Sequence, residues 1–335
     1  MNPPANPNAP IGARVSVVGG GGFLGSHLVR RLLEKPEVQR VGVFDNFSSG
    51  RLWHLDGNIR DPRLTIVRGD VHDLQALTAA LDGFDTLVHL ASNPDIARAA
   101  TEPAIDFDEG TYLTNNVVEA MRVAGVGRII YASGSGVYGD LGETEVDEDY
   151  GPLLPISTYG ASKLAGEALI SSYCHMFGFQ GQAFRFGNIV GPHQTHGVGF
   201  DFIRRLIAAP KELMILGNGM QTKSYVHVDD VIDAIFVGTT GSAASLATYN
   251  VATGDYITVI AIARLAAEVL GLDSSTIAFS FTGGDRGWKG DVPVIRLSTR
   301  KIRALGWSNR FPARDAMRSS LESIADDVRA GRMDP

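Results

Sequence analysis

Tyr159 and Lys163 stand four residues apart in the segment Ser157-Thr158-Tyr159-Gly160-Ala161-Ser162-Lys163. In a helix, this spacing makes the phenol and the ammonium project from one face, one turn apart. An ammonium beside a phenol stabilises the phenolate and lowers the pKa of the tyrosine. The spacing therefore indicates that Tyr159 is a base for a sugar or alcohol hydroxyl. Because an ordinary exposed helical pair has the same pattern, the interpretation depends on the elements around it.

A glycine turn near the N-terminus supplies that context. The run Arg14–Val18 is suited to a buried parallel strand, four glycines follow at Gly19–Gly22, and helical apolar spacing begins at Phe23. A strand, a tight glycine turn and a helix N-terminus form a site for an anion such as a pyrophosphate. The glycines satisfy two registers, Gly20-x-Gly22-x-x-Gly25 and Gly19-x-x-Gly22-x-x-Gly25.

An acidic residue at the end of the second expected strand indicates which anion is bound. The apolar run Val41–Phe44 ends in Asp45, at the distance from the glycine turn that a dinucleotide-binding unit requires. A carboxylate there accepts hydrogen bonds from ribose hydroxyls and repels a 2′-phosphate, which favours NAD over NADP. Lys163 is then also placed to hold the nicotinamide ribose. The alternative is a glycine turn without a ligand and a solvated Asp45.

The chain between these motifs alternates strands and helices. Further strands are expected at 64–67, 85–91 and 128–133, with a long helix at about 107–123. This alternation predicts an α/β fold with a Rossmann-type, doubly wound parallel sheet. Past Gly191-Pro192 the alternation loosens. We therefore expect a leader at 1–10, an NAD-binding domain at 11–190 and a smaller substrate-binding lobe at 191–335, with the two lobes interleaved.

Composition restricts the function further. The 335 residues carry a net charge of −7 with no basic tract, which argues against nucleic acid as a partner. Cys174 is the single cysteine, as is typical of a reducing compartment, and no apolar run approaches the length of a membrane span. Residues 1–10 lack the features of a signal peptide and are predicted to be disordered. These features together predict a cytoplasmic protein. We expect no metal site, because His193 and His196 lack a third ligand and are interpreted as solvated loop residues.

Several motifs occur together in a fixed order and resemble a known family. They are the glycine turn, Asp45-Asn46, Gly69-Asp70-Val71, His89-Leu90-Ala91, Val137-Tyr138-Gly139, Tyr159–Lys163, Arg185–Pro192 and His227–Val231. As a set, they resemble the extended short-chain dehydrogenase/reductase family, specifically its NAD-dependent nucleotide-sugar epimerases and dehydratases. The resemblance covers residues 13 to 310 and implies the glycine register Gly19, Gly22 and Gly25.

The resemblance implies a tightly held NAD that oxidises C4 of a nucleoside-diphosphate hexose and then returns the hydride, while Tyr159 takes the O4 proton. Residues implied in NAD binding are Gly19, Gly22, Phe23, Leu24, Gly25, Asp45, Asn46, Ser49, Gly50, Asp70, Val71, Leu90, Ala91, Ser92, Tyr159 and Lys163. Residues implied in substrate binding are Asn188, Lys223, Arg286 and Asp291, with the strand 213–217 beside the uracil. A homodimer is implied through helices near 107–123 and 159–177.

The chain departs from the family pattern near the reacting centre. The family places a Ser or Thr hydroxyl three residues before Val137, where this chain has Gly134, so either Ser133 or Ser135 is expected to supply the hydroxyl. The family's 4,6-dehydratases carry an Asp-Glu pair, and its glucuronate decarboxylases a Glu, where this chain has Ser135-Gly136. Lys223-Ser224 replaces an Arg-Asp pair, and Phe107 replaces an asparagine.

These residues predict NAD-dependent C4 epimerisation of a UDP-hexose of the UDP-glucose/UDP-galactose type, because a dehydratase needs an acid–base pair that this chain does not place there. The alternatives are a nucleotide-sugar 4,6-dehydratase, or an epimerase or decarboxylase that acts on UDP-glucuronate. A non-catalytic NAD-binding regulator is a third possibility, which Gly134 favours and the intact Tyr159 and Lys163 disfavour.

Overall fold

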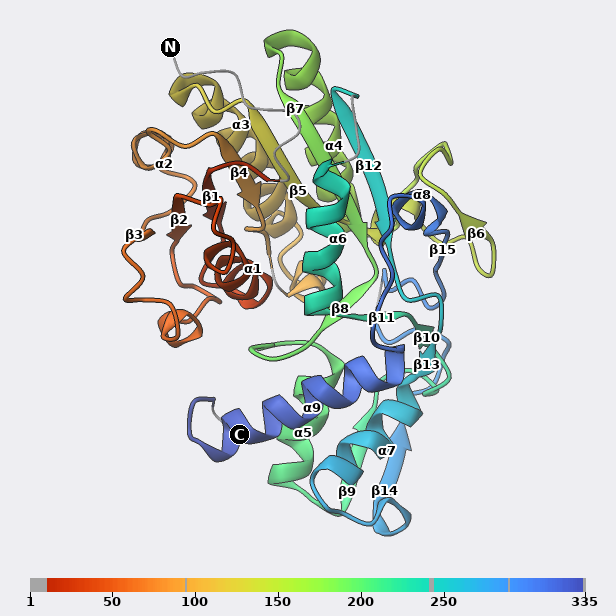
Figure 1. Cartoon of the computed structure of the whole chain (residues 1–335). Coiled ribbons are helices and arrows are strands. Elements are labelled where there is room, and N and C mark those ends of the chain that lie inside the picture. Colours follow the sequence, from red (N-terminus) through yellow and green to blue (C-terminus); the bar gives the residue numbers. More distant parts are fainter. Residues whose placement is uncertain (1–10, 94, 241–243, 289, 334–335) are drawn as a thin grey trace.

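A seven-stranded parallel sheet forms the centre of the molecule (Figure 1). The computed structural model describes residues 11–93, 95–240, 244–288 and 290–333, so the expected leader at 1–10 lies outside the described residues. In spatial order the strands are β12 (Leu246–Val251), β7 (Gln180–Phe186), β5 (Arg128–Gly134), β4 (Thr86–His89), β1 (Arg14–Val18), β2 (Arg40–Asp45) and β3 (Leu64–Arg68). Central strands of such a sheet are apolar on both faces, which the buried valines of β1 and β2 satisfy.

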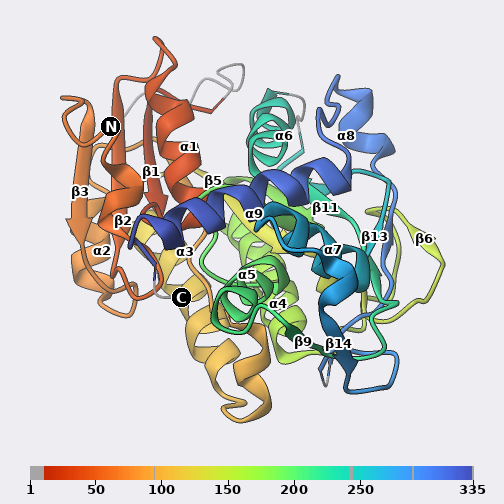
Figure 2. The same ribbon diagram turned by 90° about the horizontal axis from the view of Figure 1, so that it is seen from below.

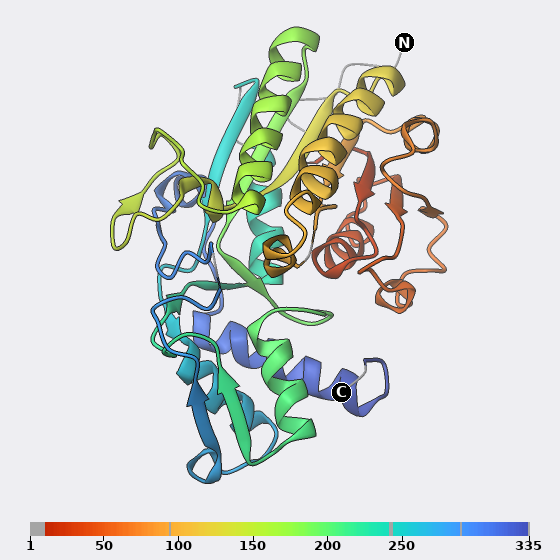
Figure 3. The same cartoon turned by 180° about the vertical axis from the view of Figure 1, so that it is seen from behind.

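Helices cover both faces of this sheet, as Figures 1 and 3 show from opposite sides. One face packs against α1 (Phe23–Leu33), α6 (Val228–Thr240) and α8 (Arg300–Ala304). The other packs against α2 (Leu74–Ala80), α3 (Leu113–Ala124) and α4 (Thr158–Phe177). The predicted doubly wound α/β fold is confirmed, and the carboxyl ends of β1, β4 and β5 meet at one edge of the sheet.

A smaller lobe lies beyond that edge and has its own apolar core (Figure 2). Its helices are α5 (Val198–Ala208), α7 (Val259–Val269) and α9 (Ala313–Arg329). Its strand pairs are β8 (Asn188–Val190) with β11 (Tyr225–His227), β9 (Glu212–Ile215) with β14 (Ala278–Phe281), and β10 (Thr222–Lys223) with β13 (Ile257–Thr258). The pair β6 (Glu145–Val146) and β15 (Arg296–Leu297) lies beside the large sheet. Short helical turns are η1 (Leu52–Leu55), η2 (Ile96–Ala100), η4 (Ser135–Tyr138) and η5 (Ser274–Thr276).

The chain crosses between the two lobes more than once. After β8 it enters the smaller lobe, returns to the large sheet through α6 and β12, and then leaves again for α7. Strand β12 extends the sheet by pairing residues 246–251 with residues 181–186 of β7. The division expected at residue 190 therefore marks the first crossing between the lobes, and residues on both sides of it contribute to the large sheet.

The helices α3 and α4, which pack on the same face of the sheet, begin in different ways. Helix α4 begins at Thr158, where the Ser157 hydroxyl accepts a hydrogen bond from the Gly160 N–H at 3.0 Å. The helix expected over 107–123 begins instead as a π-helix, η3 (Phe107–Tyr112), and becomes regular only in α3. Gly110 in η3 lies close to α4, since a Cβ atom there would approach Ser162 Oγ to 2.7 Å. No helix within the described ranges has the length and apolarity of a membrane span.

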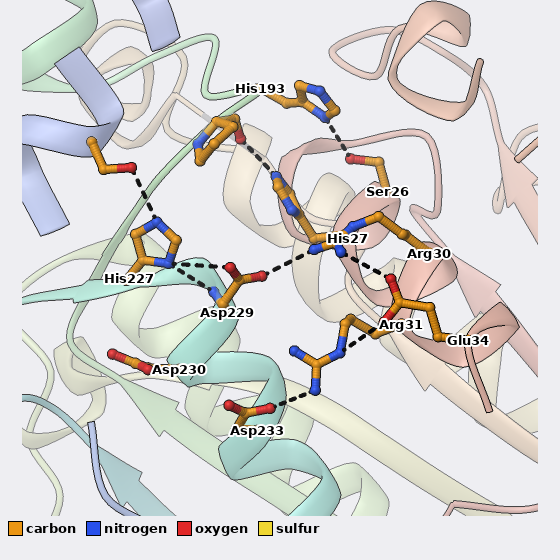
Figure 4. A network of polar contacts seen from close by, with 12 residues as sticks. Ser26, His27, Arg30, Arg31, Glu34, His193, His227, Asp229, Asp230 and Asp233 are labelled. Atoms are coloured by element: carbon orange, nitrogen blue, oxygen red, sulfur yellow. Dashed lines mark hydrogen bonds and ion pairs between the residues drawn. The ribbon is translucent and has the colours of Figure 1, made fainter. Parts of the chain in front are cut away.

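Polar contacts tie α1 to α6 and to the loop that follows β8 (Figure 4). Arg30 pairs with Asp229 at 3.1 Å, and Arg31 pairs with Asp233 at 2.7 Å. The interpretation of His193 as a solvated loop residue is wrong. Its ring stacks on that of His54 with centroids 4.7 Å apart, and its Nδ1 lies 3.2 Å from Ser26 Oγ. These contacts hold the nucleotide-binding helix against a loop of the smaller lobe.

Candidate active site

A cavity of about 690 Å³ runs from the glycine turn, across the carboxyl ends of β1, β4 and β5, into the smaller lobe. Open α/β sheets bind ligands outside the carboxyl ends of their strands, so the cavity lies where the fold predicts a site. Of the residues implied in NAD binding, the following line it: Gly19, Gly22, Phe23, Leu24, Gly25, Asp45, Asn46, Ser49, Asp70, Val71, Leu90, Ala91, Ser92, Tyr159 and Lys163.

The structure distinguishes the two glycine registers. Gly19, Gly22 and Gly25 line the cavity, whereas Gly20 packs on Val43. A Cβ atom on Gly25 would lie 2.2 Å from the Gly19 carbonyl oxygen, so the turn and the first helical residues touch backbone to backbone. Gly19 has a φ of +84°, a left-handed value that favours glycine. This geometry selects the spacing Gly19, Gly22 and Gly25.

Asp45 closes the adjacent wall of the cavity. The Gly21 N–H donates to its Oδ2 at 2.8 Å and the Phe47 N–H donates to its Oδ1 at 2.7 Å, so the carboxylate is fixed by backbone groups. Burial raises the pKa of Asp45, and these two hydrogen bonds lower it. Gly50, which was also expected to contact the cofactor, does not line the cavity. It packs on the Gly21 backbone and holds the loop against the turn.

These features fit a dinucleotide. A Cβ atom at Gly25 would collide with the Gly19 carbonyl, so glycine keeps the turn close against the helix N-terminus, which attracts a pyrophosphate. Asp45 lies at the wall where ribose hydroxyls need an acceptor. The remaining length of the cavity reaches Tyr159 and Lys163, so a nicotinamide at that end would lie beside both side chains.

Lys163 and Tyr159 lie on the same face of α4, beneath the middle of the cavity. Lys163 is 4% exposed, and its Nζ donates to the Ala132 carbonyl at 2.9 Å and lies 5.4 Å from the centroid of the Tyr159 ring. Burial lowers the pKa of Lys163 to about 8. The expected lowering of the Tyr159 pKa is wrong for this structure, because burial raises it to about 12. Desolvation of the phenolate outweighs the lowering of the pKa by the hydrogen bond from Ser92.

The two candidate serines lie in different environments. Ser133 is 4% exposed and its Oγ donates to Glu167 Oε1 at 2.5 Å. Glu167 also forms a buried ion pair with Arg185 at 2.7 Å. Ser135 lies in η4 at the cavity wall, where its hydroxyl is not engaged in such a pair. A Cβ atom on Gly134 would meet only Tyr159 Cε1, at 4.0 Å, so a space beside the phenol remains where the family has a hydroxyl.

The residues implied in substrate binding do not all reach the cavity. Asn188 and Lys223 line it, and the Lys223 ammonium pairs with the Asp291 carboxylate, which also lines it. Arg286 does not line it. Its guanidinium donates to Asp140 Oδ2 at 2.6 Å and to the Asp291 carbonyl at 2.7 Å, which turns it away from the cavity wall.

Comparisons with known proteins agree with this geometry. Residues 15–252 match the NAD dependent epimerase/dehydratase family. The chain belongs to this family. A UDP-glucose 4-epimerase of Mycolicibacterium smegmatis is 34% identical over 248 residues, which cover 72% of this chain and 77% of the relative.

Solved structures of both kinds of family enzyme superpose closely on this one. A UDP-galactose 4-epimerase crystal structure has a TM-score of 0.83 at 34% identity, covering 94% of this chain and 99% of that chain. The dTDP-glucose 4,6-dehydratase DesIV of Streptomyces venezuelae, solved with NAD bound, has a TM-score of 0.86 at 28% identity, covering 96% and 99%. This epimerase/dehydratase uses NAD, and its relatives divide between the two reactions.

Several cavity residues of this epimerase/dehydratase escaped the sequence analysis. They are Asn93, Asp95, Glu109, Gln194, Asp201, Arg205 and Trp288. They come from loops and helix starts that are far apart in the chain, and none belongs to a motif with a chemical spacing. Arg205 on α5 adds a cation near the substrate end, where its Nη1 donates to the Met214 carbonyl at 3.2 Å.

Proposed function

We propose that this enzyme epimerises C4 of a UDP-hexose of the UDP-glucose/UDP-galactose type. The observation that carries the proposal is the composition of the cavity wall opposite Tyr159. Residues 134–136 there are Gly-Ser-Gly, whereas elimination of water across C5 and C6 requires an acid–base pair. The similarity in fold does not choose between the reactions, because the dehydratase and the epimerase structures superpose about equally well.

The residues of the cavity have the following roles in this proposal. NAD, when bound, supplies the chemistry of hydride acceptance from the sugar C4 and hydride return. Tyr159 Oη takes the proton from the sugar O4 and gives it back, acting in turn as base and acid. The Lys163 ammonium, fixed by its hydrogen bond to the Ala132 carbonyl, stabilises the phenolate and holds the nicotinamide ribose. Ser135 donates a hydrogen bond that orients O4.

The smaller lobe would hold the nucleotide. Lys223 and Arg205 provide positive charge for the diphosphate, and Asn188 provides hydrogen bonds to the diphosphate or sugar. Lys223 is already paired with Asp291, so a diphosphate would share or displace that carboxylate. Arg286 would contribute to substrate binding only after it releases Asp140.

Incubation of the purified protein with UDP-glucose, UDP-galactose and UDP-glucuronate, without added reductant, tests the reaction. We expect interconversion of UDP-glucose and UDP-galactose without net loss of water and without accumulation of NADH. A 4-keto-6-deoxy product would show that the enzyme is a dehydratase. Turnover of UDP-glucuronate alone would show a glucuronate-acting enzyme, and loss of carbon dioxide would show a decarboxylase.

Ser135→Ala is expected to lower kcat by about 10- to 100-fold, because it removes one hydrogen bond to an oxygen that gains charge in the reaction. Ser133→Ala is the matched control. It removes the hydroxyl that donates to Glu167 and should reduce stability by about 1 kcal/mol with a much smaller effect on kcat. The double variant Gly134→Ser/Ser135→Ala restores a hydroxyl beside Tyr159 and should recover part of kcat. An equal loss of kcat in Ser135→Ala and Ser133→Ala would contradict this role for Ser135.

We also propose a homodimer formed through α3 and α4. Their outer faces and the adjoining η3 carry large apolar side chains that are exposed, with Met176 the most exposed at 72%. The others are Phe107, Tyr112, Val123 and Phe177. Large exposed apolar side chains on neighbouring elements are typical of an interface. Sedimentation velocity should show a dimer, and Val123→Glu/Met176→Glu should give a folded monomer. A wild-type monomer at micromolar concentration would contradict the proposal.

A further inference from the structure

A buried carboxylate lies under the active site without a role in the mechanism above. Asp106, which immediately precedes η3, is 1% exposed. In the part of the chain that the structure describes, no lysine or arginine forms an ion pair with it. Its two oxygens instead accept hydrogen bonds from Asn93 Nδ2 at 2.8 Å and from Thr158 Oγ1 at 2.6 Å. A buried charge held only by neutral donors is costly, so its position calls for a functional reason.

The two donors connect Asp106 to the reacting group from both sides. Asn93 directly follows Ser92 in the loop after β4, and Thr158 directly precedes Tyr159 at the start of α4. The Ser92 hydroxyl acts on the phenol, where it lowers the Tyr159 pKa. Asn93 also stiffens its loop, since its Nδ2 donates to the Asp95 carbonyl at 2.9 Å and its Oδ1 accepts from the Asp95 N–H at 3.0 Å. The carboxylate therefore bridges the segments that carry Ser92 and Tyr159.

We propose that Asp106 is a positioning residue that clamps the Ser92 loop to the start of α4 and so sets the Ser92 hydroxyl against the Tyr159 phenol. The proposal rests on the proposed role of Tyr159 as acid and base. In this chain Gly134 leaves a space beside the phenol, and the clamp holds the Ser92 hydroxyl at the same phenol. Asp106 acts through its neighbours and touches neither the substrate nor the cofactor in this role.

The charge of Asp106 also affects the pKa values of Tyr159 and Lys163. It raises the pKa of Lys163, against the lowering by burial, and it raises the pKa of Tyr159. Asp106 therefore helps to keep Lys163 an ammonium at neutral pH. Ser92, Tyr131 and Asp106 act on the phenol, and His89, Tyr131 and Asp106 act on the ammonium.

Two variants separate the charge from the clamp. Asp106→Asn removes the charge and preserves most of the clamp, since the Thr158 hydroxyl can turn to accept from an amide. Asp108→Asn, an exposed carboxylate in the same π-helix, is its matched control. Thr158→Val keeps the charge and breaks one arm of the clamp, and Thr158→Ser restores the hydroxyl.

The readout is the titration of the Tyr159 phenol in the NAD-containing enzyme, followed at 295 nm as the difference between each protein and the same protein carrying Tyr159→Phe. Asp106→Asn should lower the midpoint by about one pH unit and move the acidic limb of the kcat/KM profile the same way. Thr158→Val should raise the midpoint and lower kcat about 10-fold, and Thr158→Ser should reverse both changes.

An unchanged midpoint in both Asp106→Asn and Thr158→Val would overturn the inference, as would an equal shift in Asp108→Asn. The titration does not depend on the identity of the sugar. If no UDP-hexose is turned over while the midpoints shift as stated, the proposed reaction fails and the role of Asp106 stands. If a UDP-hexose is turned over while the midpoints stay unshifted, the proposed reaction stands and the role of Asp106 fails.

Discussion

Tyr159→Phe is expected to lower kcat by about 10²- to 10⁴-fold, which is the contribution typical of a positioned general acid–base group. The phenol lies at the cavity beside Lys163, and phenylalanine retains the ring while removing the proton carrier. KM for the UDP-sugar should change much less, because we propose that the smaller lobe holds the nucleotide. Steady-state rates give kcat and KM, and the amount of NAD released on denaturation measures cofactor retention.

Tyr173→Phe is the matched control for this variant. Tyr173 lies on the same helix, and its hydroxyl donates to Glu119 Oε2 at 3.2 Å, away from the cavity. It should retain wild-type kcat. A Tyr159→Phe enzyme that kept NAD and lost less than about 10-fold in kcat would contradict Tyr159 as the base and would favour a non-catalytic role for the site.

Glu167→Gln is expected to reduce the free energy of unfolding by about 3–5 kcal/mol. Glu167 receives two hydrogen bonds from the Arg185 guanidinium, at 2.7 and 2.9 Å, and one from Ser133, and both members of the ion pair are buried. Glutamine matches the shape of glutamate but leaves the Arg185 charge without a counterion in a low-dielectric interior. Urea unfolding followed by circular dichroism measures the change.

Glu102→Gln is the control for the ion pair. Glu102 pairs with Arg98 at 2.7 Å on the surface, where both side chains are about half exposed and solvent screens the pair, so its replacement should leave the free energy of unfolding close to that of the wild type. Because Ser133 and Arg185 both depend on Glu167, we also expect the loop that carries Ser135 to lose its fixed position. A loss below 1 kcal/mol in Glu167→Gln would show that the buried pair does not stabilise the fold.

The motifs that depend on local spacing could be predicted from the sequence. The strand, glycine turn and helix at residues 14–33 and the carboxylate of Asp45 predict a dinucleotide site because each depends on neighbours along the chain. The strand–helix alternation predicts the parallel sheet for the same reason, and the fold, the family and NAD are confirmed. The resemblance also implied the glycine register that the backbone contact between Gly25 and Gly19 selects.

Interactions between distant segments could not be predicted in this way. Ser133 and Ser135 are near neighbours in the sequence and both line the cavity, yet the Ser133 hydroxyl donates to the buried Glu167, whereas Ser135 begins the short helical turn η4. Arg286 was expected at the phosphates and is held instead by Asp140, which lies far away along the chain. The pKa of Tyr159 was expected to fall because of Lys163, whereas burial raises it.

The sequence by itself determined the fold class, the cofactor and the pair Tyr159 and Lys163, because local periodicity and spacing place these groups on single elements. Only the tertiary structure decided that Glu167 engages the Ser133 hydroxyl, and that Asp106 is buried between Asn93 and Thr158. Those positions depend on desolvation and on hydrogen bonds between segments that meet only when the sheet, η3 and α4 pack together, and no spacing along the chain encodes them.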